Sequence, residues 1–403
     1  METRIEEKLT QAQALVEASD ADVWLTFCRE TAEGGDPVLP FLIEGDLTWQ
    51  SALMIGRNGR RVAIVGNYDA PPLQQAGYWR EVVPYVQSIR DPLLAMLHSL
   101  IPHTVTHPRI AVNYSPHDVK ADGLSHGMYL LLESYLKGTR FENCLVSAEG
   151  IVTALRSRKT ESELEAICAA IVETDRLFDD VCSFAEIGIS ELEIQTYLQA
   201  LMEARRLGFA WNRSGNPIVN SGPDSMLGHG APSPEIFVAP GHILHLDLGV
   251  TKDGYSSDIQ RCWYAPNPGE TEAPEDIRKA LAAVNAAITA GSLALRPGIP
   301  GWQVDRAARQ ALVSAGYPEY QHALGHQVGR MAHDGGALLG PRWERYGCTP
   351  DMLVEANQVY TLELGVMVAG RGYLGIEEMV VVTEEGCEWL TVRQTELPLL
   401  GEI

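Results

Sequence analysis

Residues 245–261 carry two acidic side chains inside an alternating apolar run, and this stretch constrains the fold more than any other. The sequence there is His-Leu-Asp-Leu-Gly-Val-Thr-Lys-Asp-Gly-Tyr-Ser-Ser-Asp-Ile-Gln-Arg, with the acids at Asp247 and Asp258. Leucine occupies every second position around Asp247, which is the pattern of a half-buried strand. Residues 252–254 (Lys-Asp-Gly) supply a tight turn. The stretch is therefore predicted to form a β-hairpin.

The register of this hairpin decides how the two acids face each other. With a two-residue loop at 252–253, Asp247 and Asp258 lie directly opposite each other; with the loop at 253–254, they lie diagonally on the same face. Two ionised carboxylates on one face of a sheet repel each other in either case. A cationic group is therefore expected between them, and a pair of divalent metal ions is the most economical candidate.

A second hairpin near the C-terminus follows the same design. Residues 359–368 and 372–383 form apolar strands, and residues 369–371 (Ala-Gly-Arg) are typical of a three-residue loop in which the glycine can adopt a positive φ. Strands that pair across such a loop place Glu363 and Glu377 opposite each other. The two hairpins together predict four carboxylates on the faces of two strand pairs.

His326 lies in a segment at 322–333 that holds three histidines, and it completes the order Asp, Asp, His, Glu, Glu along the chain. This order and spacing resemble the pita-bread metallohydrolases, the family of methionine aminopeptidase, aminopeptidase P, prolidase and the metal-free creatinase. The resemblance covers residues 151–400 strongly and the first 150 residues weakly. It implies five metal ligands in the motifs Asp-x-Gly, Ser-Asp-x-x-Arg, Gly-His-x-x-Gly, Thr-x-Glu and Ile-Glu: Asp247, Asp258, His326, Glu363 and Glu377.

Two divalent ions are the expected cofactors. Four carboxylates and one imidazole offer mainly hard oxygen ligands, which favours manganese, cobalt, iron or zinc over a metal selected by thiolates, and manganese is the first choice. Two such ions can share a bridging hydroxide, lower its pKa toward neutrality and polarise a carbonyl. The alternative is that the five residues are ordinary surface groups, which disagrees with the Val-, Leu- and Ile-rich strands around the acids.

Three more histidines are candidates for the site by the same resemblance. His229 lies in a glycine-rich segment, His333 follows His326 by seven residues, and His322 precedes it by four. The resemblance implies that His229 and His333 position the substrate and stabilise oxyanion charge, and that His322 contacts the substrate. Glu363 is the expected general acid and base, which would carry the proton from the bridging water to the leaving nitrogen. The alternative for each histidine is a structural role in the core.

Three positions depart from the pattern of the resembled family. Many members have Thr where this chain has Gln260, so a contact to the metal or to one of its ligands is altered. Xaa-Pro enzymes commonly carry an Arg that helps to position the substrate where this chain has Gly375, and the difference bears on proline specificity. Gln327 replaces a glycine and narrows the expected cleft. His242 and His245, beside the first Asp, are expected to be structural.

The chain is long enough for two domains, and its pattern changes near residue 153. Residues 1–153 alternate helix and strand patterns, and the resemblance implies a creatinase-like α/β domain. Residues 154–403 would form the catalytic pita-bread domain, which gives an α/β (α+β) fold class. In that domain Gly-Ile and Gly-aromatic pairs bound residues 188–209 and recur at 298–317, which indicates an internal pseudo-twofold repeat. Helices are expected at 1–19, 92–100, 124–136, 164–181, 190–206, 274–295 and 302–315, and strands in the first domain at 23–27, 52–55, 61–65, 110–113 and around Cys144.

The composition excludes some classes of partner. The formal charge of −22 argues against nucleic acid or an anionic membrane. The first ten residues have no apolar h-region, and no stretch approaches the ~18 apolar residues of a membrane span, so a cytoplasmic protein is expected. Seven scattered cysteines, with no Cys-x-x-Cys, indicate reduced thiols.

These features predict a metal-dependent exopeptidase of the prolidase and aminopeptidase P type, with an Xaa-Pro peptide or a related small amide as substrate. The resemblance also implies a homodimer. One alternative is another reaction on the same fold, such as that of a creatinase-like C–N hydrolase or a sulfonium lyase. The other alternative is a non-catalytic binding protein that retains the metal shell. The intact set of five ligands argues against the metal-free creatinase route.

Overall fold

The computed structural model describes residues 4–228 and 231–401. The chain divides into two compact units, residues 1–156 and 157–403. Within the described ranges, no helix combines the length and the apolar character that a bilayer crossing requires.

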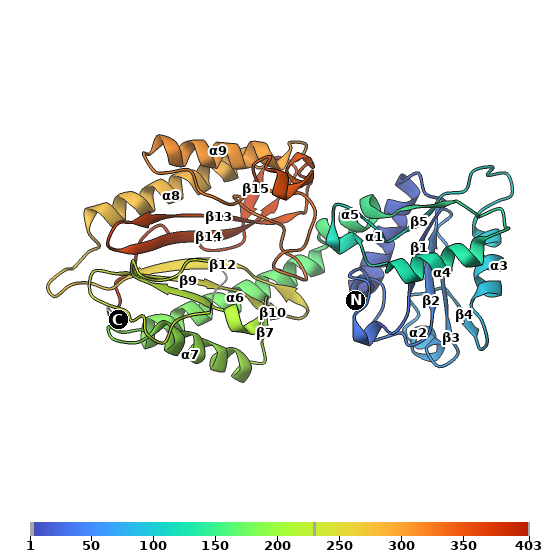
Figure 1. The fold of residues 1–403 in the computed structure, drawn as a ribbon, viewed down its shortest axis with the longest axis horizontal. Coiled ribbons are helices and arrows are strands. Elements are labelled where there is room, and N and C mark those ends of the chain that lie inside the picture. Colours follow the sequence, from blue (N-terminus) through green and yellow to red (C-terminus); the bar gives the residue numbers. More distant parts are fainter. Residues whose placement is uncertain (1–3, 229–230, 402–403) are drawn as a thin grey trace. The chain divides into compact units, whose positions relative to one another are not determined.

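The first unit is a three-layer α/β sandwich around a mixed six-stranded sheet of order β4-β3-β2-β1-β5-β6 (Figure 1). All six residues of β1 are buried, as expected of a central strand covered on both faces. Helices α1, α2 and α5 share a hydrophobic core with one face of the sheet, and α3 and α4 with the other. The elements are β1 (Val23–Cys28), β2 (Ser51–Gly56), β3 (Arg61–Gly66), β4 (Glu81–Tyr85), β5 (Ile110–Val112), β6 (Leu145–Ser147), α1 (Arg4–Ala18), α2 (Ala70–Ala76), α3 (Arg90–Leu100), α4 (His126–Leu136) and α5 (Glu149–Ser157).

The second unit is built on an antiparallel sheet of order β13-β14-β12-β9-β8, with β15 paired to β14. A small three-stranded sheet, β11-β10-β7, extends the first predicted hairpin. The strands are β7 (Gly208–Phe209), β8 (Ile218–Ser221), β9 (Ile243–Leu248), β10 (Val250–Lys252), β11 (Tyr255–Ser256), β12 (Ile259–Tyr264), β13 (Val359–Val368), β14 (Gly372–Val382) and β15 (Cys387–Trp389).

Two helix pairs cover this sheet and confirm the predicted internal repeat. Helices α6 (Glu161–Phe184) and α7 (Glu191–Ala204) share a core with β9, and α8 (Glu275–Ala294) and α9 (Gly301–Ser314) share one with β13 and β14. In Figure 1 the pair α8–α9 lies above the strands and the pair α6–α7 below them. Each half of the domain therefore contributes two helices and one hairpin to a mixed α/β pita-bread fold.

Local sequence explains where two of these helices begin. The Thr160 side chain accepts a hydrogen bond from the backbone N–H of Glu163, and the Glu163 side chain accepts one from the backbone N–H of Thr160. Ser190 and Glu193 form the same reciprocal pair at the start of α7. Each capping box satisfies backbone donors that the first helical turn leaves free. The two capping boxes thus fix where α6 and α7 begin.

Candidate metal centre and active-site cleft

The first hairpin turns at residues 253–254, the second of the two loops that the sequence allows. Both turn residues have a positive φ, 50° and 79°, as a type I′ turn requires. The strand pairing that follows from this turn places Asp247 opposite Gln260. Asp258 precedes Gln260 by two residues, so it lies on the same face and diagonal to Asp247. The two acids of the hairpin therefore share one face of the sheet.

The second hairpin has the predicted three-residue loop, and Gly370 in this loop has a φ of 70°. Its register places Glu363 directly opposite Glu377. Glu377 in turn pairs with Gln260 on β12. A single row of polar side chains consequently crosses four neighbouring strands of the sheet, β13, β14, β12 and β9: Glu363, Glu377, Gln260 and Asp247.

His326 reaches this row from the loop that follows α9. Its backbone is anchored to β13, because the N–H of Thr361 donates to the His326 carbonyl at 3.0 Å and the Thr361 hydroxyl accepts from the His326 N–H at 3.2 Å. The imidazole Nε2 then lies 3.7 Å from Asp258 Oδ2 and 3.5 Å from Glu363 Oε1. Burial, followed by the nearby His333, lowers the pKa of His326 to about 3, so the ring is neutral and suited to bind a metal ion.

The four carboxylates perturb one another strongly. Burial raises the pKa of each, and it is the largest cause for all four. Repulsion from neighbouring carboxylates raises the pKa of Asp247, Asp258 and Glu377 further. Like charges held this close in a buried site oppose each other's ionisation unless a cation compensates them.

A divalent metal site fits this arrangement of donors. Asp247 Oδ1 and both carboxylate oxygens of Glu377 are buried and have no hydrogen-bond partner among the described residues. Buried polar atoms are normally satisfied, so these three oxygens call for a ligand from outside the chain. Three overlapping sets of donor atoms lie within 4.8 Å of one another: Asp258, His326 and His333; His326, Glu363 and Glu377; and Asp247, Asp258 and Glu377.

The five predicted ligands and two of the three predicted histidines line one cleft with a volume of about 910 Å³. His333 packs edge-on against His326, with ring centroids 4.1 Å apart. His322 donates from Nδ1 to the Ala323 carbonyl at 2.8 Å, which leaves Nε2 as an acceptor, and burial lowers the pKa of this ring. The third histidine, His229, lies outside the described residues.

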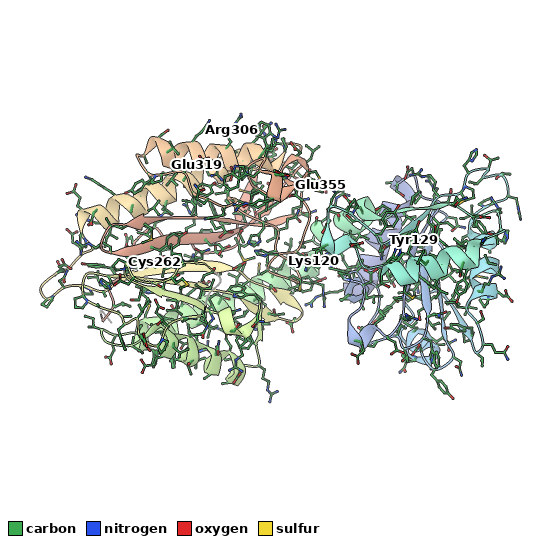
Figure 2. All side chains as sticks on the ribbon, in the orientation of Figure 1. Lys120, Tyr129, Cys262, Arg306, Glu319 and Glu355 are labelled. Atoms are coloured by element: carbon green, nitrogen blue, oxygen red, sulfur yellow. The ribbon has the colours of Figure 1, made fainter. Side chains whose placement is uncertain are left out.

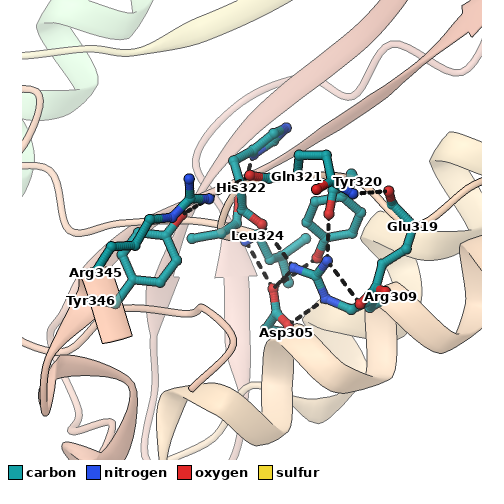
Figure 3. A network of polar contacts seen from close by, with 10 residues as sticks. Asp305, Arg309, Glu319, Tyr320, Gln321, His322, Leu324, Arg345 and Tyr346 are labelled. Atoms are coloured by element: carbon teal, nitrogen blue, oxygen red, sulfur yellow. Dashed lines mark hydrogen bonds and ion pairs between the residues drawn. The ribbon is translucent and has the colours of Figure 1, made fainter. Parts of the chain in front are cut away.

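An ion pair between Asp305 and Arg309 holds the segment that carries His322 (Figure 3). The sequence patterns above do not predict this role. Arg309 on α9 forms a bidentate pair with Asp305 at 2.9 Å, and it donates to the backbone carbonyls of Tyr320 and His322 at 2.6 and 2.8 Å. Asp305 also accepts from the Tyr320 hydroxyl. The i,i+4 spacing of Asp305 and Arg309 on a helix was the sequence signal that could have indicated this ion pair.

Gln260 and His245 form a hydrogen bond beside the carboxylates, and the sequence predicts this arrangement only in part. Gln260 Nε2 donates to Glu363 Oε2 at 3.0 Å, so the residue that stands in place of Thr contacts a predicted ligand. His245 was expected to be structural, and its ring is buried between Asn220 and Gln260 at 3.1 and 3.0 Å. Its ring also lines the cleft. The sequence signal for its place in the cleft was the spacing of two residues from Asp247, because residues two apart on a strand lie on the same face.

Thiols do not join the donor set. Cys262 lies two residues after Gln260 on β12 (Figure 2), and its thiol donates to the Gly375 carbonyl at 3.2 Å. Burial raises the pKa of this thiol to about 12, which keeps it protonated. All seven cysteines are free thiols. The site therefore offers oxygen and imidazole donors.

Fold and site together define a pita-bread metallohydrolase. The model of metallopeptidase family M24 matches residues 151–384, more than half of the chain, and the chain belongs to this family. It is a metallopeptidase, and peptidases of this family depend on divalent metal ions. An uncharacterized peptidase of Staphylococcus aureus (strain bovine RF122 / ET3-1) is 26% identical over 341 residues, which cover 84% of this chain and 87% of that protein.

Solved structures share the fold across both units. The X-Pro aminopeptidase from Thermotoga maritima aligns with a TM-score of 0.70 and 24% identity, covering 97% of this chain and 99% of that one. The Xaa-Pro dipeptidase from Bacillus anthracis aligns with a TM-score of 0.73 and 24% identity, covering 98% and 100%. At this level of identity the comparison establishes the fold.

Proposed function

We propose that this metallopeptidase releases the N-terminal residue of peptides, with Xaa-Pro bonds as its preferred substrates. The observation that carries the proposal is the convergence of Asp247, Asp258, His326, Glu363 and Glu377 on one cleft. The similarity of the fold to an X-Pro aminopeptidase and an Xaa-Pro dipeptidase supports the choice of substrate.

The five converging residues would hold two divalent ions, and their oxygen-rich donors favour manganese. Such ions supply a nucleophile at neutral pH, by lowering the pKa of water, and polarise the carbonyl of the scissile bond. The orphaned oxygens of Asp247 and Glu377 support this assignment, because a cation would satisfy them without any change in the chain.

Glu363 would move the proton in this reaction. Gln260 holds its Oε2 through a hydrogen bond of 3.0 Å, and Oε1 lies 3.5 Å from His326 Nε2. Burial raises the pKa of Glu363 to about 7, which suits a group that accepts and returns a proton near neutral pH. His322, with Nε2 as an acceptor, would receive a hydrogen bond from the substrate.

Metal loading tests the proposed function directly. Protein stripped with a chelator is expected to be inactive, and titration with Mn²⁺ should bind two ions per chain and restore hydrolysis of Ala-Pro peptides. Isothermal calorimetry gives the number of ions, and release of the N-terminal residue gives the activity. Hydrolysis that persists without metal would refute the assignment of the site. A protein that is fully loaded but leaves every Xaa-Pro bond intact would refute the substrate.

Substitution of Gln260 by Leu is expected to lower kcat by about 10- to 100-fold, because it removes a hydrogen bond that orients Glu363. The same bond lowers the pKa of Glu363, so its loss should move the acid limb of the kcat–pH profile to higher pH. Metal content serves as the control and should stay near wild type, whereas the midpoint of thermal unfolding should fall, because buried His245 Nε2 loses its hydrogen-bond partner. An acid limb at the wild-type pH would show that Gln260 does not act on Glu363.

A further inference from the structure

The charged side chains that line the described part of the cleft are all acidic. Among the described residues that line it, none is Lys or Arg, and five are acidic: Asp247, Asp258, Glu319, Glu363 and Glu377. The remaining titratable groups of the lining are imidazoles and phenols. A substrate that enters this cleft therefore meets no side chain of permanent positive charge along the described part of its wall.

Two arginines bind the backbone of cleft-lining residues, and both are already engaged. Arg309 uses all five of its N–H groups, on Asp305, Glu319 and the carbonyls that hold the His322 segment (Figure 3). Arg345 donates to the Gln321 carbonyl and to the Tyr346 hydroxyl, and its guanidinium stacks on the Trp343 ring at 4.6 Å. Neither arginine belongs to the lining of the cleft.

The structure also excludes a side chain at position 375. A Cβ atom on Gly375 would lie 2.4 Å from the Tyr373 ring, 2.9 Å from Gln260 Oε1 and 3.0 Å from His245 Nε2. Gly375 pairs with Gly365, where a Cβ atom would lie 2.4 Å from the Tyr373 hydroxyl oxygen. The phenol ring therefore covers both glycines, and the space beside Glu377 is filled by uncharged groups.

This charge pattern bears on the size of the substrate. In a dipeptide the free carboxylate lies one residue, about 3.8 Å of chain, beyond the scissile bond. It would enter the acidic cleft without a Lys or Arg side chain to pair with among the described residues of the lining, and an unpaired buried charge is strongly disfavoured. When the chain continues, the same position carries a neutral carbonyl. The exposed apolar side chains of Leu227 and Met367 on the cleft wall can then contact the later residues.

We propose that the cleft selects peptides of three or more residues over dipeptides, because its described lining provides no cationic side chain for a carboxylate next to the scissile bond. This inference rests on the proposed function and narrows it to an aminopeptidase. Recognition of the substrate is expected to come from metal coordination, from the imidazoles and from apolar contact with Tyr373 and Met367 rather than from an ion pair.

Matched substrates test the inference. In Mn²⁺-loaded protein, kcat/KM is expected to be at least about 10-fold higher for Ala-Pro-Ala and for Ala-Pro amide than for Ala-Pro. The same three substrates with Leu in place of Pro separate Xaa-Pro specificity from selection against dipeptides. If only the Leu substrates are hydrolysed, and the tripeptide and the amide are preferred over the dipeptide, Xaa-Pro specificity is refuted and selection against dipeptides is supported. If no peptide is hydrolysed, the dissociation constants of each dipeptide and of its amide, measured by calorimetry, are compared instead. A kcat/KM or an affinity for the free dipeptides that equals or exceeds the value for their amides overturns the inference.

A charge introduced on the cleft wall gives an independent test. Met367 is half exposed, lines the cleft and pairs with Tyr373, so a longer side chain can extend into the cleft there. Met367→Arg is expected to raise kcat/KM for Ala-Pro relative to its amide by about 10-fold. Met367→Gln, of similar length and uncharged, should keep the wild-type ratio. Equal ratios in the two folded variants would contradict the role of charge.

Discussion

Replacing Glu377 with Gln is expected to stabilise the metal-free protein and to abolish its activity. Glu377 is 1% exposed, and both of its carboxylate oxygens lack a hydrogen-bond partner among the described residues. Burial and then the carboxylates of Asp258, Glu363 and Asp247 raise its pKa well above the ordinary range. A neutral amide removes one of four repelling charges and can donate hydrogen bonds to the others. The same change removes a ligand that the metal ions would require.

The pH dependence of stability follows from the raised pKa values. Carboxyl groups of this kind bind more protons in the native chain than in the unfolded chain, so the stability of the metal-free protein falls as pH rises from about 4 toward neutrality. At pH 8 the free energy of unfolding of metal-free Glu377→Gln should exceed that of wild type by about 1–3 kcal/mol. Mn²⁺ at 100 times its Kd should add about 2.7 kcal/mol to wild type for each bound ion, and far less to the variant.

Glu378→Gln is the matched control, because the neighbouring residue faces the opposite side of the sheet. Glu378 is fully buried, but it accepts hydrogen bonds from Arg261 at 2.9 Å, Thr391 at 2.6 Å and the backbone of Gln394 at 2.8 Å. Loss of this charge leaves Arg261 unpaired and should destabilise the protein with or without metal. Urea unfolding at pH 5 and pH 8 measures both variants. A metal-free Glu377→Gln protein less stable than wild type at pH 8 would contradict the account of the site.

The two hairpins that carry the four carboxylates were predictable, because the sequence signals that define them are local. Period-two alternation marks the strands, and loop length fixes the register, so the pairing of Glu363 with Glu377 follows from a three-residue loop. For the first hairpin the sequence allowed two loops. The observed loop at residues 253–254 is the one in which Asp and Gly, which tolerate a positive φ better than Lys does, occupy both turn positions.

Other features depend on contacts between distant segments. The first hairpin is interrupted at Gly249, where a Cβ atom would lie 2.4 Å from the Trp211 ring and 2.5 Å from the Ser257 carbonyl oxygen. Strands β9 and β10, on either side of Gly249, belong to different sheets. Nothing in the local alternation indicates this break, and Trp211, which packs against Gly249, comes from a separate segment of the chain.

The position of His326, a proposed ligand on a loop, could not be predicted from local pattern either. His326 lies on no periodic element, and it reaches the carboxylates only because its backbone bonds to Thr361, 35 residues further along the chain. Family resemblance, rather than pattern, placed it in the ligand set. Arg309 and Asp305 show a helical spacing that is common on exposed surfaces, and their role becomes visible only when Arg309 is seen to hold the His322 carbonyl.

Glu363→Gln is expected to reduce kcat by about 10²–10⁴-fold, the range that general acid–base groups contribute. The amide keeps the size of the side chain and can still accept a hydrogen bond from Gln260, which donates to Glu363 Oε2 at 3.0 Å. It cannot take up a proton from water or return one to the leaving nitrogen. Stopped assays with Ala-Pro-Ala measure the loss, and the metal content of the same samples is measured in parallel.

Because Glu363 is proposed both as a metal ligand and as the proton carrier, its two roles must be separated. A defect that arises from weaker metal binding is relieved by excess Mn²⁺, since mass action refills the site. A defect in proton transfer persists when two ions per chain are bound. Glu363→Asp, which keeps an ionisable group, should retain more activity than Glu363→Gln at saturating Mn²⁺. Recovery of wild-type kcat by Glu363→Gln in excess Mn²⁺ would leave Glu363 with a ligand role alone and would require another residue to carry the proton.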